Sequence, residues 1–359
     1  MNTFLKFDRS EYDELFSVRS VPWDKLSNKT NLVTWATGLI GSALIDILLY
    51  AEKKMCLNTN IIALVRNMDK AEKCFSEQLK DNAPIDFIVG TVEKLPAIEK
   101  NVDYIVHGAS QTSSKAFVEK PAETILTALN GTVNLLELAR LKKTEGFVYL
   151  SSMEVYGTQR KGTKITENTS CMLSPLNLRS SYPVSKQQCE ALCCAYCAEY
   201  GVPAKIIRLT QTFGPGVQID DGRVFAEFAR CIKNHRDIVL KTKGETERSY
   251  LYIADAVTAI LTVLLKGKNG TAYNAADEKT YCSISEMAEE VAKYGNVNVR
   301  YEIADIAQNG YLDTIYMDLD TSGLLQLGWK PIGKGLVWMY EKMLNSSEFS
   351  KAQQEGSDE

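Results

Sequence analysis

The chain has 359 residues, 45% hydrophobic and 24% charged, which is the composition of an ordinary globular protein with a sizeable core. A formal net charge of -4 and the lack of a dense basic block argue against nucleic-acid binding. The amino-terminal segment is charged and no apolar run approaches the ~20 residues of a membrane span, so we expect a cytoplasmic protein with no membrane partner.

The predicted elements alternate between strands and helices for most of the chain. Residues 1–28 are predicted to form an acidic helical extension. Strands are predicted at 31–34, 61–65, 87–89, 104–107, 147–150 and 204–209, and helices at 42–54, 125–141 and 185–200. Strands that alternate with helices predict parallel strands joined by right-handed crossovers, so we expect an α/β fold whose first domain covers 29–210.

The pattern becomes less regular beyond Phe213. Gly and Pro interrupt it at 214–216. Helices are predicted at 223–233, 253–265 and 285–293. We expect residues 211–345 to form mainly a smaller α+β lobe. The polar carboxyl-terminal end predicts a disordered tail over 346–359.

Four of the nine cysteines cluster on one predicted helix, at positions 189, 193, 194 and 197. Three of these positions share one helical face, which is typical of small apolar packing residues. No second pair of cysteines at metal-ligand spacing follows, and the chain has only two histidines. We therefore expect reduced thiols and no metal site.

A glycine-containing turn joins the first strand to the first helix at 36–42, Ala-Thr-Gly-Leu-Ile-Gly-Ser. Gly38 and Gly41 fit the last two glycines of a G-x-x-G-x-x-G turn, which lets backbone amides at a helix N-terminus approach a pyrophosphate. Glycine is needed because a side chain would fill the space of the ligand or of the helix–strand contact. The residues predicted to hold a dinucleotide are Thr37, Gly38, Leu39, Ile40 and Gly41.

A serine and a Tyr-x-x-x-Lys pair lie farther along the chain. The four-residue spacing puts Tyr182 and Lys186 on one helical face. A lysine ammonium there can lower the pKa of the phenol, and the phenolate can then remove a hydroxyl proton from a substrate. Ser152 ends the preceding strand, in Ser-Ser-Met-Glu-Val-Tyr-Gly at 151–157, where its hydroxyl can bind an oxygen that alternates between alcohol and ketone.

These three segments, in this order, resemble the extended short-chain dehydrogenase/reductase family, whose cofactor turn usually reads Gly-Ala-Thr-Gly-Phe-Ile-Gly. The resemblance continues through 208–215 and 327–331 and covers nearly all of residues 30–345. It implies a Rossmann-type doubly wound parallel sheet that binds a nicotinamide dinucleotide, and a carboxyl-terminal lobe that binds a nucleoside-diphosphate sugar. It also implies a homodimer packed through the helix that carries the Tyr-x-x-x-Lys pair.

Three residues depart from the family's usual pattern. Trp35 replaces the first glycine of the turn, where an indole either displaces the cofactor or forces the loop to move. Thr91 stands where an acidic residue often contacts the adenine, and Ala128 where an asparagine usually supports the catalytic region.

Arg66 bears on the choice of cofactor because it ends the second predicted strand. An acidic residue there would accept hydrogen bonds from the ribose and favour NAD. An arginine can instead bind a 2′-phosphate. The expected cofactor is therefore NAD or NADP, with NADP preferred unless Arg66 is a solvated loop residue.

Glu154 and Met153 bear on the step that follows oxidation of the sugar. Glu154 stands where sugar-nucleotide 4,6-dehydratases and UDP-glucuronate decarboxylases carry glutamate, and a carboxylate beside a 4-keto sugar can remove the acidified C5 proton. Met153 stands where dTDP-glucose 4,6-dehydratases place an aspartic acid that protonates the leaving hydroxyl, and a thioether cannot donate a proton. The segment Asp-Gly-Arg-Val at 221–224 is similar to that of the decarboxylases.

The resemblance also indicates which residues bind the substrate. Arg223 and Arg248 are candidates for the diphosphate, since guanidinium groups bind phosphate in a bidentate way. Arg179 and Gln211 are further candidates, although each arginine taken alone is more often a surface salt-bridge residue. The residues predicted to be catalytic are Ser152, Glu154, Tyr182 and Lys186.

We therefore expect a nucleotide-sugar-modifying enzyme that uses transient oxidation at C4 and then decarboxylation, dehydration or epimerisation, in that order of preference. One alternative is an NADPH-dependent keto-sugar-nucleotide reductase, which needs only the serine, tyrosine and lysine and tolerates Met153. The other is a catalytically silent sugar-nucleotide-binding protein that has lost its cofactor, as the three departures from the family pattern would suggest.

Overall fold

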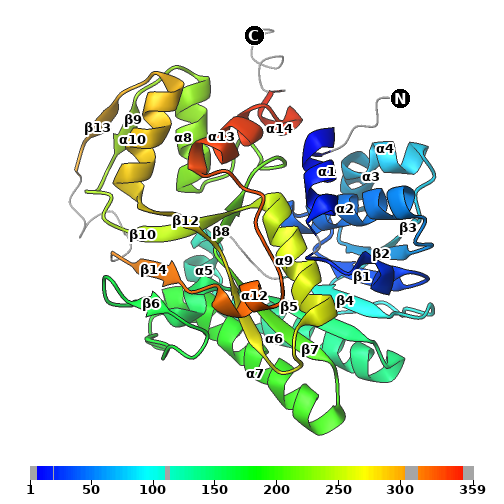
Figure 1. The fold of residues 1–359 in the computed structure, drawn as a ribbon. Helices are drawn as coiled ribbons and strands as arrows, with labels where there is room; N and C mark the ends of the chain where they lie inside the picture. The colour runs from blue at the N-terminus through cyan, green and yellow to red at the C-terminus, as the bar shows by residue number, and fades with distance from the viewer. Residues whose placement is uncertain (1–5, 19, 110–113, 304–313, 351–359) are drawn as a thin grey trace.

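A seven-stranded parallel sheet forms the centre of the larger lobe in the computed structural model, which describes residues 6–18, 20–109, 114–303 and 314–350 (Figure 1). The strands are β1 (Thr30–Thr34), β2 (Asn60–Val65), β3 (Ile85–Val89), β4 (Tyr104–His107), β5 (Gly146–Ser152), β7 (Ala204–Leu209) and β11 (Ala272–Ala275). Their spatial order is β11-β7-β5-β4-β1-β2-β3, and each neighbouring pair is parallel. The predicted α/β class and Rossmann-type sheet are confirmed.

Helices cover both faces of this sheet (Figure 1). They are α2 (Leu39–Met55), α6 (Pro121–Lys142), α7 (Ser181–Tyr200) and α9 (Ile253–Lys266). Val33 of β1 packs in the core that contains α2 and α9, and its neighbour Leu32 packs in the core that contains α6 and α7. Because both faces of the sheet are buried, its strands are continuous apolar runs. Such runs are the pattern from which the strands were predicted. No helix in the described ranges is both long and apolar enough to cross a membrane.

The smaller lobe is built around a mixed sheet in the order β12-β10-β14-β6, with β8 also paired to β10. Its strands are β6 (Lys164–Ile165), β8 (Gln211–Phe213), β10 (Glu247–Tyr252), β12 (Asp277–Ser283) and β14 (Tyr316–Leu319), and β9 (Ile238–Leu240) pairs separately with β13 (Val299–Tyr301). Further helices are α3 (Met68–Cys74), α4 (Ser76–Lys80), α5 (Ser114–Glu119), α8 (Val224–Lys233), α10 (Ile284–Gly295) and α12 (Ser322–Gln326), with 3-10 turns at Trp23–Leu26, Met153–Tyr156 and Leu178–Ser180.

The two lobes exchange segments, so the main sheet does not stop at residue 210. After β10 the chain returns through α9 to β11, which pairs with β7. Conversely, β6 precedes residue 210 and pairs with β14 of the smaller lobe. Every residue of α9 from Ile253 to Leu265 is buried, as expected for a helix enclosed by the rest of the chain.

Both ends of the described chain pack on the core. In the amino-terminal extension, α1 (Arg9–Ser17) lies beside α2 (Figure 1). At the other end, α13 (Leu336–Leu344) is followed by α14 (Ser347–Ser350), which falls within the tail predicted to be disordered. This part of the tail is helical because the side chain of Phe349 is buried in the core. The rest of the predicted tail, 351–359, lies outside the described residues.

Candidate functional site

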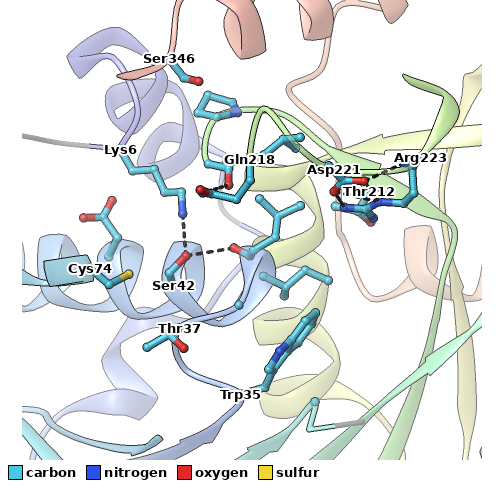
Figure 2. A pocket seen from close by; sticks show the side chains of 18 of the residues that line it. Lys6, Trp35, Thr37, Ser42, Cys74, Thr212, Gln218, Asp221, Arg223 and Ser346 are labelled. Atoms are coloured by element: carbon cyan, nitrogen blue, oxygen red, sulfur yellow. Dashed lines mark hydrogen bonds and ion pairs between the residues drawn. The ribbon is translucent and has the colours of Figure 1, made fainter. Parts of the chain in front are cut away.

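A cavity of about 1470 Å³ lies at the carboxyl ends of β1, β4 and β5. The order of the strands reverses between β1 and β4, and ligands of doubly wound folds bind at such a switch point. Its walls come from the turn after β1, the end of β5, α7 and the segment from β8 to α8, and also from α3 and α4, the segment after α13 and the amino-terminal segment. Figure 2 shows the side of the cavity that Lys6, Trp35, Cys74, Arg223 and Ser346 line. The predicted site residues that line it are Thr37, Gly38, Leu39, Ile40, Ser152, Glu154, Tyr182, Lys186, Gln211 and Arg223.

The serine, tyrosine and lysine meet at one wall of the cavity. Tyr182 and Lys186 lie one turn apart on α7, and the Tyr182 phenol lies near Ser152 at the end of β5. The Lys186 ammonium donates to the carbonyl of Leu150 at 2.6 Å and lies 5.7 Å from the centre of the Tyr182 ring. Burial lowers the pKa of Lys186 to about 8.

The pKa of Tyr182 is raised, which is opposite to the direction expected from the lysine charge. Burial of the phenol is the largest cause, and the charge of Glu154 adds to it. The nearby Ser152 hydroxyl and the charge of Arg179 lower this pKa but do not outweigh burial. Deprotonation of the phenol therefore requires more positive charge in the cavity than these residues supply.

Glu154 projects into the cavity and is paired with Arg179 behind it. The guanidinium and carboxylate are 3.2 Å apart, and the guanidinium also lies 4.8 Å from the centre of the Phe117 ring. Arg179 itself is not among the residues that line the cavity. The pair orients the Glu154 carboxylate toward the space beside Tyr182.

Met153 is 3% exposed and belongs to the core of the smaller lobe. The Thr210 hydroxyl donates its proton to the carbonyl of Ser249 at 2.6 Å and lies 3.2 Å from the Met153 sulfur. The wall beside Glu154 therefore offers a thioether where the resemblance would place a proton donor.

The turn after β1 carries Trp35 in a left-handed backbone conformation, with φ of 57°. Its indole lies over Gly38, where an added Cβ would meet the ring at 2.4 Å. A Cβ on Gly41 would lie 2.2 Å from the carbonyl oxygen of Trp35, so only glycine allows this helix–strand contact. Among the described residues, the amides of Leu39 and Ile40 have no protein acceptor. With the helix dipole they form an anion site.

Arg66 and Arg248 are predicted site residues that do not line the cavity. Arg66 is exposed at the end of β2. Arg248 lies on β10 between Cys282 and Met317 of the neighbouring strands, and its Nε is buried with no hydrogen-bond partner in the described part of the chain. The roles of both arginines remain predictions.

The other two departures from the family pattern lie in ordinary local structure. The Thr91 hydroxyl accepts a hydrogen bond from the backbone amide of Lys94 at 3.2 Å. Ala128 is buried, and the thiol of Cys189 donates to its carbonyl at 3.4 Å. Cys189 and Cys193 are buried against α6, which is the packing role expected for this face of α7.

Arg223 lines the cavity at the start of α8. Its guanidinium binds the carboxylate of Asp221 at 2.9 and 2.5 Å and lies 4.7 Å from the centre of the Phe225 ring. Gln211 begins β8 and lines the same cavity. Asp221 holds the arginine in place, and the bidentate pair neutralises part of its charge.

Lys6 is a cavity residue that no sequence motif indicated. It lies in the amino-terminal extension, outside the segments that carry the family resemblance. A lysine in a segment without periodicity or motif gives no signal from one sequence, so only the fold brings it to the turn after β1.

Residues 31–276 match the model of the NAD dependent epimerase/dehydratase family. The chain is 28% identical over 319 residues to UDP-glucuronic acid decarboxylase 6 of Arabidopsis thaliana (88% of this chain, 89% of the relative). It is 26% identical over 308 residues to dTDP-D-glucose 4,6-dehydratase of Homo sapiens (80% and 86%). The fold is similar to that of dTDP-glucose 4,6-dehydratase of Bacillus anthracis in complex with NAD, with a TM-score of 0.70, 20% identity and coverage of 88% and 95%. Because the family match covers more than half of the chain, this protein belongs to the NAD dependent epimerase/dehydratase family.

Proposed function

We propose that the protein binds NAD or NADP at the turn after β1 and transforms a nucleoside-diphosphate sugar through transient oxidation at C4. The observation that carries the proposal is the cavity wall on which Tyr182, Ser152 and Lys186 meet. The names of the two relatives above, a decarboxylase and a dehydratase of sugar nucleotides, support the same substrate class.

The start of α2 fits the diphosphate of a dinucleotide. The amides of Leu39 and Ile40 have no other acceptor among the described residues, and glycine at 38 leaves the backbone open to the cavity except where the Trp35 indole covers it. The bound dinucleotide would accept hydride from the sugar and return it. The lean to NADP rests on the guanidinium of Arg66 alone, which is exposed after β2 and does not line the cavity, so NAD is the equal alternative.

Ser152, Tyr182 and Lys186, which we call the catalytic wall, each have a separate part in the oxidation at C4. The Oη of Tyr182 accepts the proton of the C4 hydroxyl, and the Oγ of Ser152 holds the oxygen as it becomes a ketone. The Lys186 ammonium stabilises the phenolate from within the protein, where the low dielectric strengthens its charge. Because burial raises the pKa of Tyr182, the positive charge of an oxidised nicotinamide would assist the same step.

Decarboxylation is the preferred next step because it needs no acid at position 153. A carboxylate on C5 is β to the C4 ketone, so it leaves as CO₂ without protonation of a leaving group. The electron pair of the broken bond forms an enolate, which takes a proton at C5 to restore the ketone. Dehydration requires protonation of a departing hydroxyl, which the Met153 sulfur cannot provide. Glu154 lines the cavity, where its carboxyl group can remove a proton from C5 or return one to it. Epimerisation would require the same proton transfer.

An NADPH-dependent reductase of keto-sugar nucleotides is the second candidate. The burial of Met153 favours it, because a reductase needs no proton donor at that position. Reduction would consume NADPH stoichiometrically, whereas the preferred reaction regenerates its cofactor.

We further propose a cytoplasmic homodimer packed through α7, the helix that carries Tyr182 and Lys186. The exposed face of α7 carries small side chains, which allow a second helix to approach closely. These residues are Ala191, Cys194, Ala195 and Ala198.

The test is incubation of the protein with UDP-glucuronate in the presence of NAD or NADP, with the anomeric proton signals followed by NMR. We expect product signals with the natural chain. Tyr182→Phe should lower turnover by about 10²- to 10⁴-fold, because the proton acceptor is lost, while UDP-glucuronate still binds. Tyr200→Phe on the exposed end of the same helix is the matched control and should react normally.

Three results would change the proposal. Unchanged spectra with both cofactors would exclude decarboxylation. Full turnover by Tyr182→Phe would show that another group accepts the proton. Net oxidation of NADPH by a keto-sugar nucleotide, without cofactor recycling, would favour the reductase.

A further inference from the structure

Lys6 places an ammonium at the first turn of α2. Its Nζ donates to the hydroxyl of Ser42 at 2.6 Å, and this hydroxyl in turn donates to the carbonyl of Leu39 (Figure 2). Lys6 is half-buried and lines the same cavity as the catalytic wall. The ammonium therefore lies beside the anion site formed by the turn after β1.

The charge of Lys6 is only partly compensated within the protein, by the nearby carboxyl of Asp46. The N-terminus of α2 is the positive end of the helix dipole, and a second positive charge there is repelled. Within the described part of the chain, the Lys6 ammonium forms no ion pair within 4 Å and donates a single hydrogen bond of the three available to it. The charge of Lys6 also acts on the nearby carboxyl of Asp46, whose pKa it lowers against the larger effect of burial, and this carboxyl accepts from the Tyr12 hydroxyl and, at 3.0 Å, from the Gln78 amide. A bound anion would satisfy both the ammonium and the helix end.

The segment after β8 leaves room for this lysine. An added Cβ on Gly216 would lie 2.4 Å from the Cε and 2.6 Å from the Nζ of Lys6. Gly216 also has a φ of 97°, which side chains rarely adopt. A larger residue at 216 would push the ammonium away from Ser42.

The extension that carries Lys6 is fastened to both lobes. Tyr12 of α1 bonds Asp46 of α2 in the larger lobe. Glu11 accepts from the hydroxyl of Tyr252 at the end of β10, and Lys342 of α13 donates to Asp8 at 2.6 Å. These contacts hold the segment over the turn, so Lys6 is presented by a fixed element.

We propose that Lys6 is a ligand of the diphosphate of the dinucleotide, supplied by the amino-terminal extension to the anion site of α2. This inference rests on the proposed binding of NAD or NADP. The lysine adds a full positive charge to the amides of Leu39 and Ile40 and so compensates for the indole that narrows the turn. The extension is then part of the cofactor site.

The experiment is calorimetric titration of the full chain with NAD and with ADP-ribose, which keeps the diphosphate and lacks the nicotinamide. Lys6→Met should weaken both by about ten- to a hundredfold, the usual effect of losing a charge-assisted hydrogen bond. Lys6→Arg should restore most of the affinity. Lys334→Met is the matched control, since Lys334 pairs with Glu14 of α1 at 3.3 Å and does not line the cavity.

A parallel titration with UDP identifies which diphosphate the lysine meets. Unchanged UDP affinity in Lys6→Met supports the assignment to the dinucleotide. Weaker UDP binding in this variant, with or without weaker NAD binding, would overturn it. Equal NAD affinity in the natural chain and Lys6→Met would also overturn it and leave the proposed function intact. If the natural chain binds neither NAD nor NADP, the proposed function fails and this inference fails with it. Equal thermal unfolding midpoints show that each variant is folded.

Discussion

Trp35 combines a backbone conformation that favours glycine with a large indole side chain. Its backbone has a φ of 57°, which glycine adopts without steric cost and a tryptophan does not. Its half-buried indole covers Gly38 and faces Gly108 after β4, so the ring lies in the crevice between β1 and β4. A dinucleotide bound along this crevice must share it with the ring.

We expect Trp35→Gly to bind NAD more tightly than the natural chain, by on the order of tenfold. Displacement of a half-buried indole costs roughly 1–2 kcal/mol of lost apolar burial, and the substitution removes this cost. Calorimetric titration with NAD and NADP measures the effect.

Trp35→Ala distinguishes the effect of the indole ring on NAD binding from the effect of the backbone conformation. If the indole occludes the crevice, alanine should give most of the gain, and if only the backbone matters the gain should be confined to glycine. Weaker binding by both variants would mean that the indole is itself a cofactor contact. The same titrations decide between NAD and NADP and so test the role of Arg66.

Residues in contiguous motifs could be predicted from the sequence, and residues placed by tertiary structure could not. The Tyr-x-x-x-Lys spacing is set by the helix period, so Tyr182 and Lys186 reach the cavity together. The direction of the shift in the pKa of Tyr182 could not be predicted, because it depends on burial by segments distant in sequence. Arg248 lies on a strand whose neighbours, β12 and β14, come later in the chain. Lys6 reaches the site only because α1 packs on α2.

At the scale of elements, α1 is held by a buried polar pair as well as by the apolar packing of Tyr12, Leu15 and Phe16 in the core. The Tyr12 hydroxyl bonds the Asp46 carboxyl, and both side chains are buried. The Tyr12 ring also stacks on Tyr50 with centroids 4.1 Å apart. Burial raises the pKa of Asp46, so the carboxyl depends on its donors when it is ionised.

Tyr12→Phe should lower the free energy of unfolding by about 1–3 kcal/mol, because the buried Asp46 carboxyl loses a donor while the ring stack remains. Urea unfolding followed by circular dichroism measures the change. Tyr50→Phe is the matched control, since the Tyr50 hydroxyl has no hydrogen-bond partner in the described part of the chain. Equal losses in the two variants would show that the Tyr12–Asp46 bond contributes little.

The bounds of most predicted elements lie within a few residues of those in the structure. Strand β7 is the same, and α9 differs by one residue, because both are bounded by charged or turn residues around an apolar run. The exchange of α9, β11 and β6 between lobes was not predicted. Periodicity reports which face of an element is buried but not which lobe buries it.

At the scale of the whole molecule, Asp255 joins segments far apart in sequence. It lies in the first turn of α9, and its two oxygens accept the backbone amides of Ile332 at 2.7 Å and Gly333 at 2.9 Å. Burial raises the pKa of Asp255 to about 7, with the charges of Asp277 and Glu14 adding to the effect, although the two amides act in the opposite direction. The contact ties the returning helix to the segment before α13.

The raised pKa of Asp255 predicts how the stability of the whole molecule changes with pH. The folded state favours the protonated carboxyl, so its contribution is fully present below about pH 4, decreases as the pH rises, and is lost above about pH 7. Asp255→Asn cannot ionise, so its free energy of unfolding should decrease less than that of the natural chain between pH 4 and 7. Slopes are compared rather than absolute values, because asparagine replaces only one of the two acceptors. Urea unfolding at four pH values measures both slopes, and parallel slopes would place the ionisation of Asp255 outside this range.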